Sequence, residues 1–127
     1  MYYQATITTP ANTSSGVPLV TTLLLARGLI TRVVVGFPSG LFGLCHVQIN
    51  DKGWQIVPWS LGEDLAWNNY VYVLNMQYEL IAEPYEVTVI TWNDDDSYDH
   101  RVFIGIEITE GDIVRSEMLA QYPLAEG

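Results

Sequence analysis

The chain has 127 residues, a formal net charge of −10 at pH 7, and nearly equal numbers of hydrophobic and other residues. This length fits one domain that buries a core without disulfides or metal, and this composition excludes a disordered chain. Lysine occurs once, at Lys52, and the arginines are scattered, so nucleic acid is not an expected partner.

Neither a membrane span nor a secretory signal is expected. The most apolar stretch, residues 17–37, is interrupted by Arg27, Gly28 and Arg32. The first residues lack a positive segment followed by an apolar block and a small-residue cleavage site.

Short alternating or β-branched runs, separated by turn residues, dominate the first half of the chain. The opening run stops at Pro10, and Asp51-Lys52-Gly53 is typical of a hairpin turn in which glycine takes a positive φ. Arg27-Gly28 indicates a tight turn or a kink between two apolar runs. These patterns predict strands over residues 2–9, 18–26, 29–37, 44–50 and 54–57.

The second half continues the same pattern after an irregular connection over residues 59–68. Strands are predicted over residues 69–81, 85–92 and 100–109. Only residues 112–121 have a helical pattern, which predicts a short C-terminal helix or an extended tail. Eight short strands in residues 1–127 predict a single all-β domain, an antiparallel β-sandwich of the jelly-roll type.

The sequence contains no recognisable catalytic apparatus, and we do not expect an enzyme. His46 and His100 both lie within strand patterns, and Cys45 shares a face with Val47 and Ile49, which is typical of a buried thiol. The chain has no G-x-S-x-G nucleophile elbow and no phosphate-binding loop.

One acidic cluster is a candidate metal site. Asp94, Asp96 and Asp99 lie with Asp95 between two predicted strands, and carboxylate oxygens are the ligands that calcium prefers. The glycine and terminal glutamate of an EF-hand loop are missing, so the alternative is a solvated turn. No cofactor other than calcium is expected.

Consecutive apolar residues in the early strands predict burial on both faces, which one small sandwich does not usually provide. The chain also lacks the lysines that protect edge strands. We therefore expect a homo-oligomer, of which a trimer is one form, with residues 1–16 and 112–127 as candidate arms between subunits. The candidate interface residues are Leu23, Leu25, Val33, Val35, Trp59 and Trp67, the two tryptophans because they lie in the irregular connection.

Residues 29–108 resemble small β-sandwich components of bacterial virus particles. The resemblance rests on ITRVVVGFPSG, HVQINDKGWQIVPWS and ITWNDDDSYDHRVFIGIEI. It implies a virion protein that decorates or cements a capsid or associates with a fibre, and a capsid or fibre protein as partner. The alternative is a carbohydrate- or ligand-binding sandwich, assisted by calcium, in which exposed aromatic side chains stack on sugars.

Overall fold

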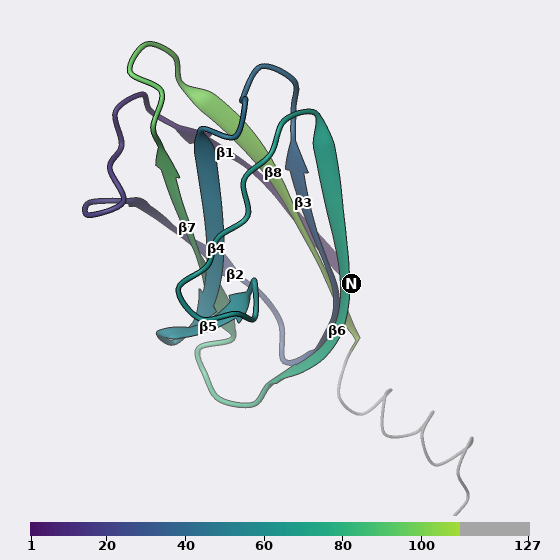
Figure 1. Cartoon of the computed structure of the whole chain (residues 1–127). Coiled ribbons are helices and arrows are strands. Elements are labelled where there is room, and N and C mark those ends of the chain that lie inside the picture. The colour runs from purple at the N-terminus through teal and green to yellow at the C-terminus, as the bar shows by residue number, and fades with distance from the viewer. Residues whose placement is uncertain (110–127) are drawn as a thin grey trace, which may run out of the picture.

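The computed structural model describes residues 1–109, which form strands and their connections (Figure 1). Its eight strands are β1 (Tyr2–Thr9), β2 (Leu19–Leu24), β3 (Gly28–Phe37), β4 (Cys45–Asp51), β5 (Trp54–Val57), β6 (Tyr70–Leu80), β7 (Glu86–Asn93) and β8 (His100–Thr109). Each predicted strand is present, and β1, β5 and β8 have the predicted bounds. The helix or tail predicted over residues 112–121 lies outside the described residues.

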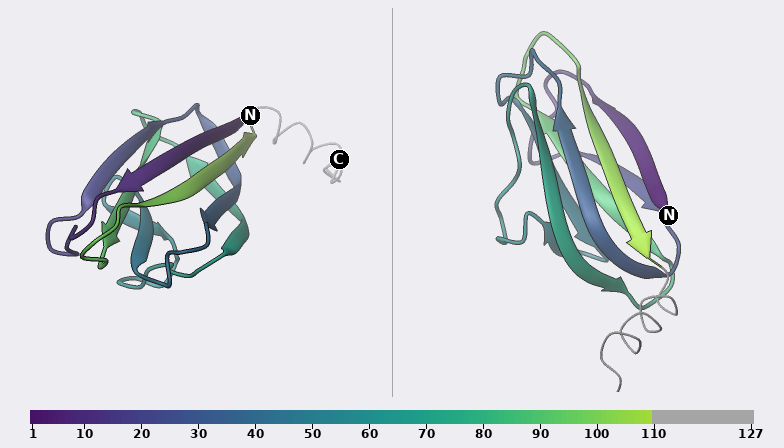
Figure 2. Two further views of the ribbon diagram at one scale, coloured as in Figure 1. Left: turned by 90° about the horizontal axis from the view of Figure 1, so that it is seen from above. Right: turned by 90° about the vertical axis from the view of Figure 1, so that its right-hand side faces the viewer.

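The strands form two antiparallel sheets that face each other as two layers (Figure 2). Sheet A has the order β1-β8-β3-β6, and sheet B has the order β2-β7-β4-β5. The pairings are nested along the chain, since β1 pairs with β8, β2 with β7, β3 with β6 and β4 with β5. The predicted all-β antiparallel sandwich is therefore confirmed.

The core lies between the two sheets and is built from alternate residues of the strands. In β8, for example, Val102, Ile104, Ile106 and Ile108 all point inward and are at most 1% exposed. They meet inward residues of sheet B such as Val47, Ile49 and Val89, which are fully buried. This alternation is the period of two that places successive side chains on opposite faces of a strand.

The two early apolar strands do not form a hairpin, because β2 belongs to sheet B and β3 to sheet A. The link that contains Arg27 crosses from one layer to the other. Gly28 starts β3 so close to β8 that a Cβ there would lie 2.5 Å from the carbonyl oxygen of Thr109. The sequence therefore has glycine at this crossing because only a residue without a Cβ fits.

The inner face of β3 is buried within its own chain, while cover of the outer faces of the early strands by a second subunit or by residues 112–127 stays a prediction. β3 is an inner strand between β8 and β6, and Val33, Val35 and Phe37 point into the core of their own chain. On the opposite face, Val34 is half-buried by its neighbours in the same sheet. The inner face of β3 is therefore buried within one chain, whereas on its outer face Val34 is only partly buried and Arg32 is exposed.

The predicted N-terminal arm is part of the sandwich. Residues 2–9 form β1 and pair along their whole length with β8. The loop that follows is held by the chain itself, because the Asn12 N–H donates to the carbonyl oxygen of Asp95. The candidate arm at residues 112–127 lies outside the described part of the chain.

Candidate functional site

The acidic loop between β7 and β8 directs its carboxylates to separate partners. Asp94 Oδ2 lies 2.8 Å from His46 Nε2, and Asp99 Oδ1 accepts the backbone N–H of Ala11 at 2.9 Å. Asp96 Oδ1 accepts the hydroxyl of Ser97. Residues 1–109 contain no group of three or more His, Cys, Asp or Glu side chains that could hold a metal ion. The predicted calcium ligands Asp94, Asp96 and Asp99 are therefore not brought together.

Asp95 and Asn93 organise the interior of this loop. Asp95 Oδ1 accepts the backbone N–H groups of Ser97 and Tyr98, and Asp95 Oδ2 lies 2.8 Å from His100 Nε2. Hydrogen bonds from Ser97 and His100 lower the pKa of Asp95 below its ordinary value. The buried Asn93 amide donates to the carbonyl oxygens of Thr9 and Tyr98. These polar groups stabilise the loop itself.

His46 on β4 connects two loops, a role that the sequence pattern did not indicate. Its Nδ1 lies 2.7 Å from Asp64 in the connection after β5, and its Nε2 faces Asp94 on the acidic loop. The imidazole also stacks on Trp92, with ring centroids 5.0 Å apart and planes 7° apart. Each ring nitrogen of His46 therefore faces a carboxylate oxygen from a different loop. Through these contacts His46 acts as a clamp that holds the acidic loop and the connection after β5 together.

Cys45 is buried in the core next to this clamp. Burial is the main cause that raises the pKa of its thiol to about 11, with a further contribution from the charge of Asp94. A thiol with this pKa is protonated at neutral pH and is a weak nucleophile.

The structure separates the predicted interface residues into two groups. Val33 and Val35 are completely buried in their own core, so their assignment to an interface is wrong. Leu23 and Leu25 are half-buried and pack against the same core, which leaves them little free surface. Trp59 and Trp67 are exposed, as predicted, at 67% and 57% of their surface. Whether these tryptophans contact a partner stays a prediction.

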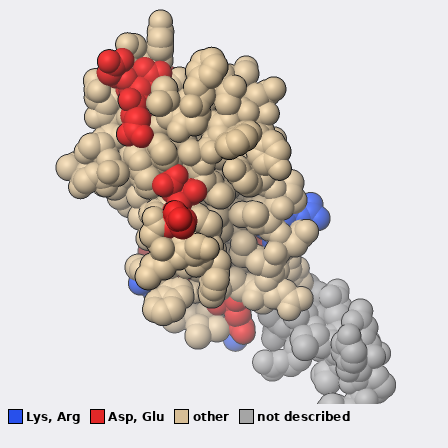
Figure 3. Space-filling view, viewed as in Figure 1, with Lys and Arg blue, Asp and Glu red and all other residues tan. Residues whose placement is uncertain are grey.

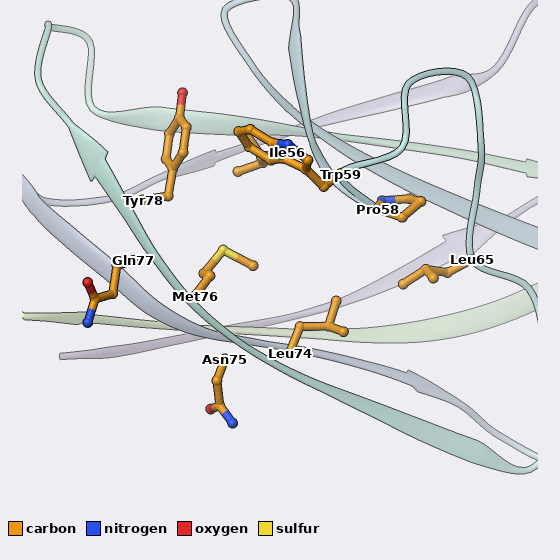
Figure 4. Close-up of a pocket in the computed structure, with 9 residues that line it drawn as sticks. All are labelled: Ile56, Pro58, Trp59, Leu65, Leu74, Asn75, Met76, Gln77 and Tyr78. Carbon is orange, nitrogen blue, oxygen red and sulfur yellow. The ribbon is translucent and has the colours of Figure 1, made fainter.

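Trp59 stands at the rim of a groove that opens between the two sheets (Figure 4). The groove has a volume of about 420 Å³ and lies where the sandwich is open, between β6 at the edge of sheet A and β5 with its following connection at the edge of sheet B. Leu74, Met76 and Tyr78 of β6 point into it, and Asn75 and Gln77 point away (Figure 4). The opposite wall consists of Ile56, Pro58, Trp59 and Leu65.

The polar groups beside the groove are already used within the chain. The Tyr78 hydroxyl donates to Asp51 Oδ2 at 2.7 Å, and burial together with this hydrogen bond raises the pKa of Tyr78 to about 12. Gln55 lies by a second hollow of about 290 Å³ between Trp54 and Trp59. Its amide donates to carbonyl oxygens of the connection, at Pro58, Ser60 and Glu63. The side chains that face the groove are therefore mainly apolar, since Asn75 and Gln77 of its lining point away from it.

A second apolar surface, here called the outer band, lies on part of the outer face of sheet A and consists of Tyr2, Val34, Val71, Val73 and Phe103. The pairing register brings them together, because Val34 lies between Val73 and Gly105, and Gly36 lies between Val71 and Phe103. Val71, Val73 and Tyr2 are each about half exposed, at 55%, 54% and 54%, and Phe103 is 41% exposed.

Glycine flattens the outer band and lets the aromatic rings lie on the sheet. The Tyr2 hydroxyl sits over Gly105, where a Cβ would collide with it. Phe103 lies beside Gly36, where a Cβ would meet its side chain at 3.4 Å. Such aromatic cover over strand glycines is a known device for shielding them. The pattern of a single strand does not reveal this surface, because polar residues such as Asn75, Gln77 and Glu107 share the outward faces of β6 and β8 with the members of the outer band.

No family model, curated protein or solved structure matches this chain. Within residues 1–109, no helix is long and apolar enough to cross a membrane.

Proposed function

We propose that this chain is a structural assembly subunit, a capsid-decorating, cementing or fibre-associated component of a virion that acts through contacts between copies. The observation that carries the proposal is the outer band. A monomeric protein rarely exposes a large contiguous apolar patch, and such patches mark interaction sites. The virion setting rests on the resemblance of residues 29–108 to small sandwich proteins of bacterial viruses.

We also infer that the sandwich is a jelly roll. Its nested pairing, from β1 with β8 inward to β4 with β5, supports this description. A jelly roll of eight strands is an architecture that viral capsid proteins share with lectins and cupins. The fold agrees with the proposal but does not distinguish among those functions.

The outer band suits the packing of one sheet against another. Sheets stack about 10 Å apart through side chains that interdigitate, and the half-exposed valines and aromatic rings of the band supply such side chains. Arg32 and Glu107 are cross-strand neighbours at its margin and provide both signs of charge at the rim. A second copy that covers the band would form a homo-oligomer, and the experiment below measures the number of copies in it.

Sedimentation equilibrium at micromolar concentration tests the proposal with a matched pair of variants. Val73 lies on the outer band and is 54% exposed, whereas Val20 lies on the outer face of sheet B and is 56% exposed. We expect wild type and Val20→Lys to form the same oligomer and Val73→Lys to be monomeric, because a buried lysine without a partner opposes association. A wild-type chain that is strictly monomeric would contradict the proposal.

The virion setting has its own test. Mass spectrometry of purified particles of a virus that encodes this chain should detect it in a fixed ratio to the main capsid or fibre protein. Detection only in the soluble fraction of infected cells would contradict a virion role while leaving self-association intact.

A further inference from the structure

The free edge of β6 lies beside the groove. β6 (Tyr70–Leu80) is the longest strand and the last of sheet A, and among residues 1–109 it pairs only with β3. Every second N–H and C=O group along an edge strand points outward with no partner in the sheet. Natural edges are usually shielded by lysine, proline or an inward-pointing charge. The only charged residue of β6 is Glu79.

The groove lies next to this edge, in the opening between the two sheets. A strand added next to β6 would turn alternate side chains toward the space between the sheets, in line with Leu74, Met76 and Tyr78 (Figure 4). Leu74 and Met76 are half-buried and face Ile56, Pro58 and Leu65 across the opening. The added strand would therefore gain main-chain hydrogen bonds from the edge and apolar contacts from the groove.

We propose that β6 and the groove bind an extended segment of another protein by strand addition. The segment has apolar residues at alternate positions and basic residues beside them. Strand addition uses backbone hydrogen bonds for affinity and pockets for alternate side chains for specificity. This site is independent of the proposed self-association, because the groove lies on the inner side of sheet A and the outer band lies on the opposite side.

The charge of this face of the molecule favours a segment of another protein over a second copy of this chain as the occupant of the groove. Asp51 accepts the hydroxyl of Tyr78 beside the groove and lies 3.4 Å from the single lysine, Lys52, which also donates to the carbonyl oxygens of Ala82 and Pro84. Figure 3 shows carboxylates in separate groups on the face that carries β4, β5 and β6, with basic side chains only at its margin. A second copy would bring its own net charge of −10 to this rim. A segment with lysine or arginine meets the rim with opposite charge.

The probe is a synthetic peptide in which valine and threonine alternate between two terminal lysines. We expect saturable binding to the full chain by fluorescence anisotropy, and slower hydrogen exchange of the β6 amides in the complex. Two control peptides dissect the contact: one is N-methylated at alternate amides, and the other ends in glutamate. Both should bind at least about tenfold more weakly, which corresponds to about 1.4 kcal/mol.

A matched pair of protein variants locates the site. Met76→Lys places a charge inside the groove, as natural edges do for protection, and should abolish binding. Gln77→Lys places the same charge on the same strand but pointing away (Figure 4), and should retain it. Both variants are first shown to unfold cooperatively with the wild-type strand content.

Four results would overturn the proposal. They are no binding of the probe at millimolar concentration, equal binding by both variants, protection of amides outside β6, and equal binding of the N-methylated peptide. Self-association that Met76→Lys removes without any peptide would identify a second copy as the occupant instead. Binding to a glycan array that Met76→Lys removes would identify a sugar.

Discussion

The acidic loop between β7 and β8 and the groove beside β6 differ in whether their side chains are paired within the chain. At the acidic loop, the carboxylates of Asp94, Asp95 and Asp99 each meet a partner within the chain. At the groove, apolar side chains and a strand edge lie without cover from residues 1–109. The charged side chains of the loop are thus paired within the chain, whereas the apolar side chains of the groove are the surface for which we propose a binding role.

The contrast has a physical cause. A buried polar group is costly without a partner, and Asn93 and His100 are buried and Asp95 is partly buried, so this loop folds with those three side chains hydrogen-bonded within the chain. An exposed apolar side chain costs little free energy in the monomer, and its burial is available as binding energy. Substitutions at the acidic loop should therefore change stability, and substitutions at the groove should change binding.

The largest effect is expected for Asn93→Ala. The Asn93 side chain donates to Thr9 and Tyr98 and accepts the N–H of Asp95, so its loss leaves buried partners unsatisfied. We expect the free energy of unfolding, measured with urea, to fall by about 2–3 kcal/mol. Asn75→Ala on the exposed side of β6 is the control and should change it by less than about 0.5 kcal/mol. Equal effects would remove the distinction between the two regions.

Asp95→Asn should make the stability of the fold depend less on pH in the acid range. The pKa of Asp95 is lowered from 3.8 in the folded chain, so the folded state favours the carboxylate. The stability this adds is present above pH 3.8 and is lost as the pH falls through the folded value. Thermal melts from pH 7 downward should show wild type more stable at neutral pH and the gap closing in acid. A constant gap would show that Asp95 does not titrate with folding.

A smaller effect is expected for Tyr78→Phe at the groove. The free energy of unfolding should fall by about 1 kcal/mol, because one hydrogen bond to Asp51 is lost. The folded pKa of Tyr78 is raised from 10.0 to about 12, so its stabilising contribution is complete below pH 10 and disappears as the pH rises through 12. Chemical denaturation at pH 8 and at pH 11 should show a smaller difference in the free energy of unfolding between variant and wild type at the higher pH. An unchanged difference would exclude this linkage.

The smallest effect is expected for Trp59→Ala. The ring is 67% exposed and makes an edge contact with Tyr78, with centroids 6.4 Å apart. The free energy of unfolding should change by less than about 1 kcal/mol, the range of a surface substitution that loses one aromatic contact. The same variant should weaken binding of the valine-threonine peptide severalfold. A large loss of stability would mean that the rim of the groove supports the fold.

The core residues could be predicted from the sequence, because alternation along a strand indicates which side chains face the core. The runs at residues 2–9, 54–57 and 100–109 became strands with those bounds, and the hairpin at Asp51–Gly53 has the positive φ predicted for Gly53. Local chemistry fixed these features, since each depends only on residues next to one another in the chain.

Only the tertiary structure decided which strands are neighbours, and with them both candidate surfaces. Val71, Val73 and Phe103 lie far apart in the sequence or among polar neighbours, and only the register of β3 with β6 and β8 places them together. Val33 and Val35 looked available for a partner until β3 proved to be an inner strand. Asp94 and Asp99 were predicted to bind one cation, but the structure places Asp94 against His46 and Asp99 against the backbone N–H of Ala11. Period-two alternation fixes the face on which a residue lies, but long-range pairing fixes what lies beside it.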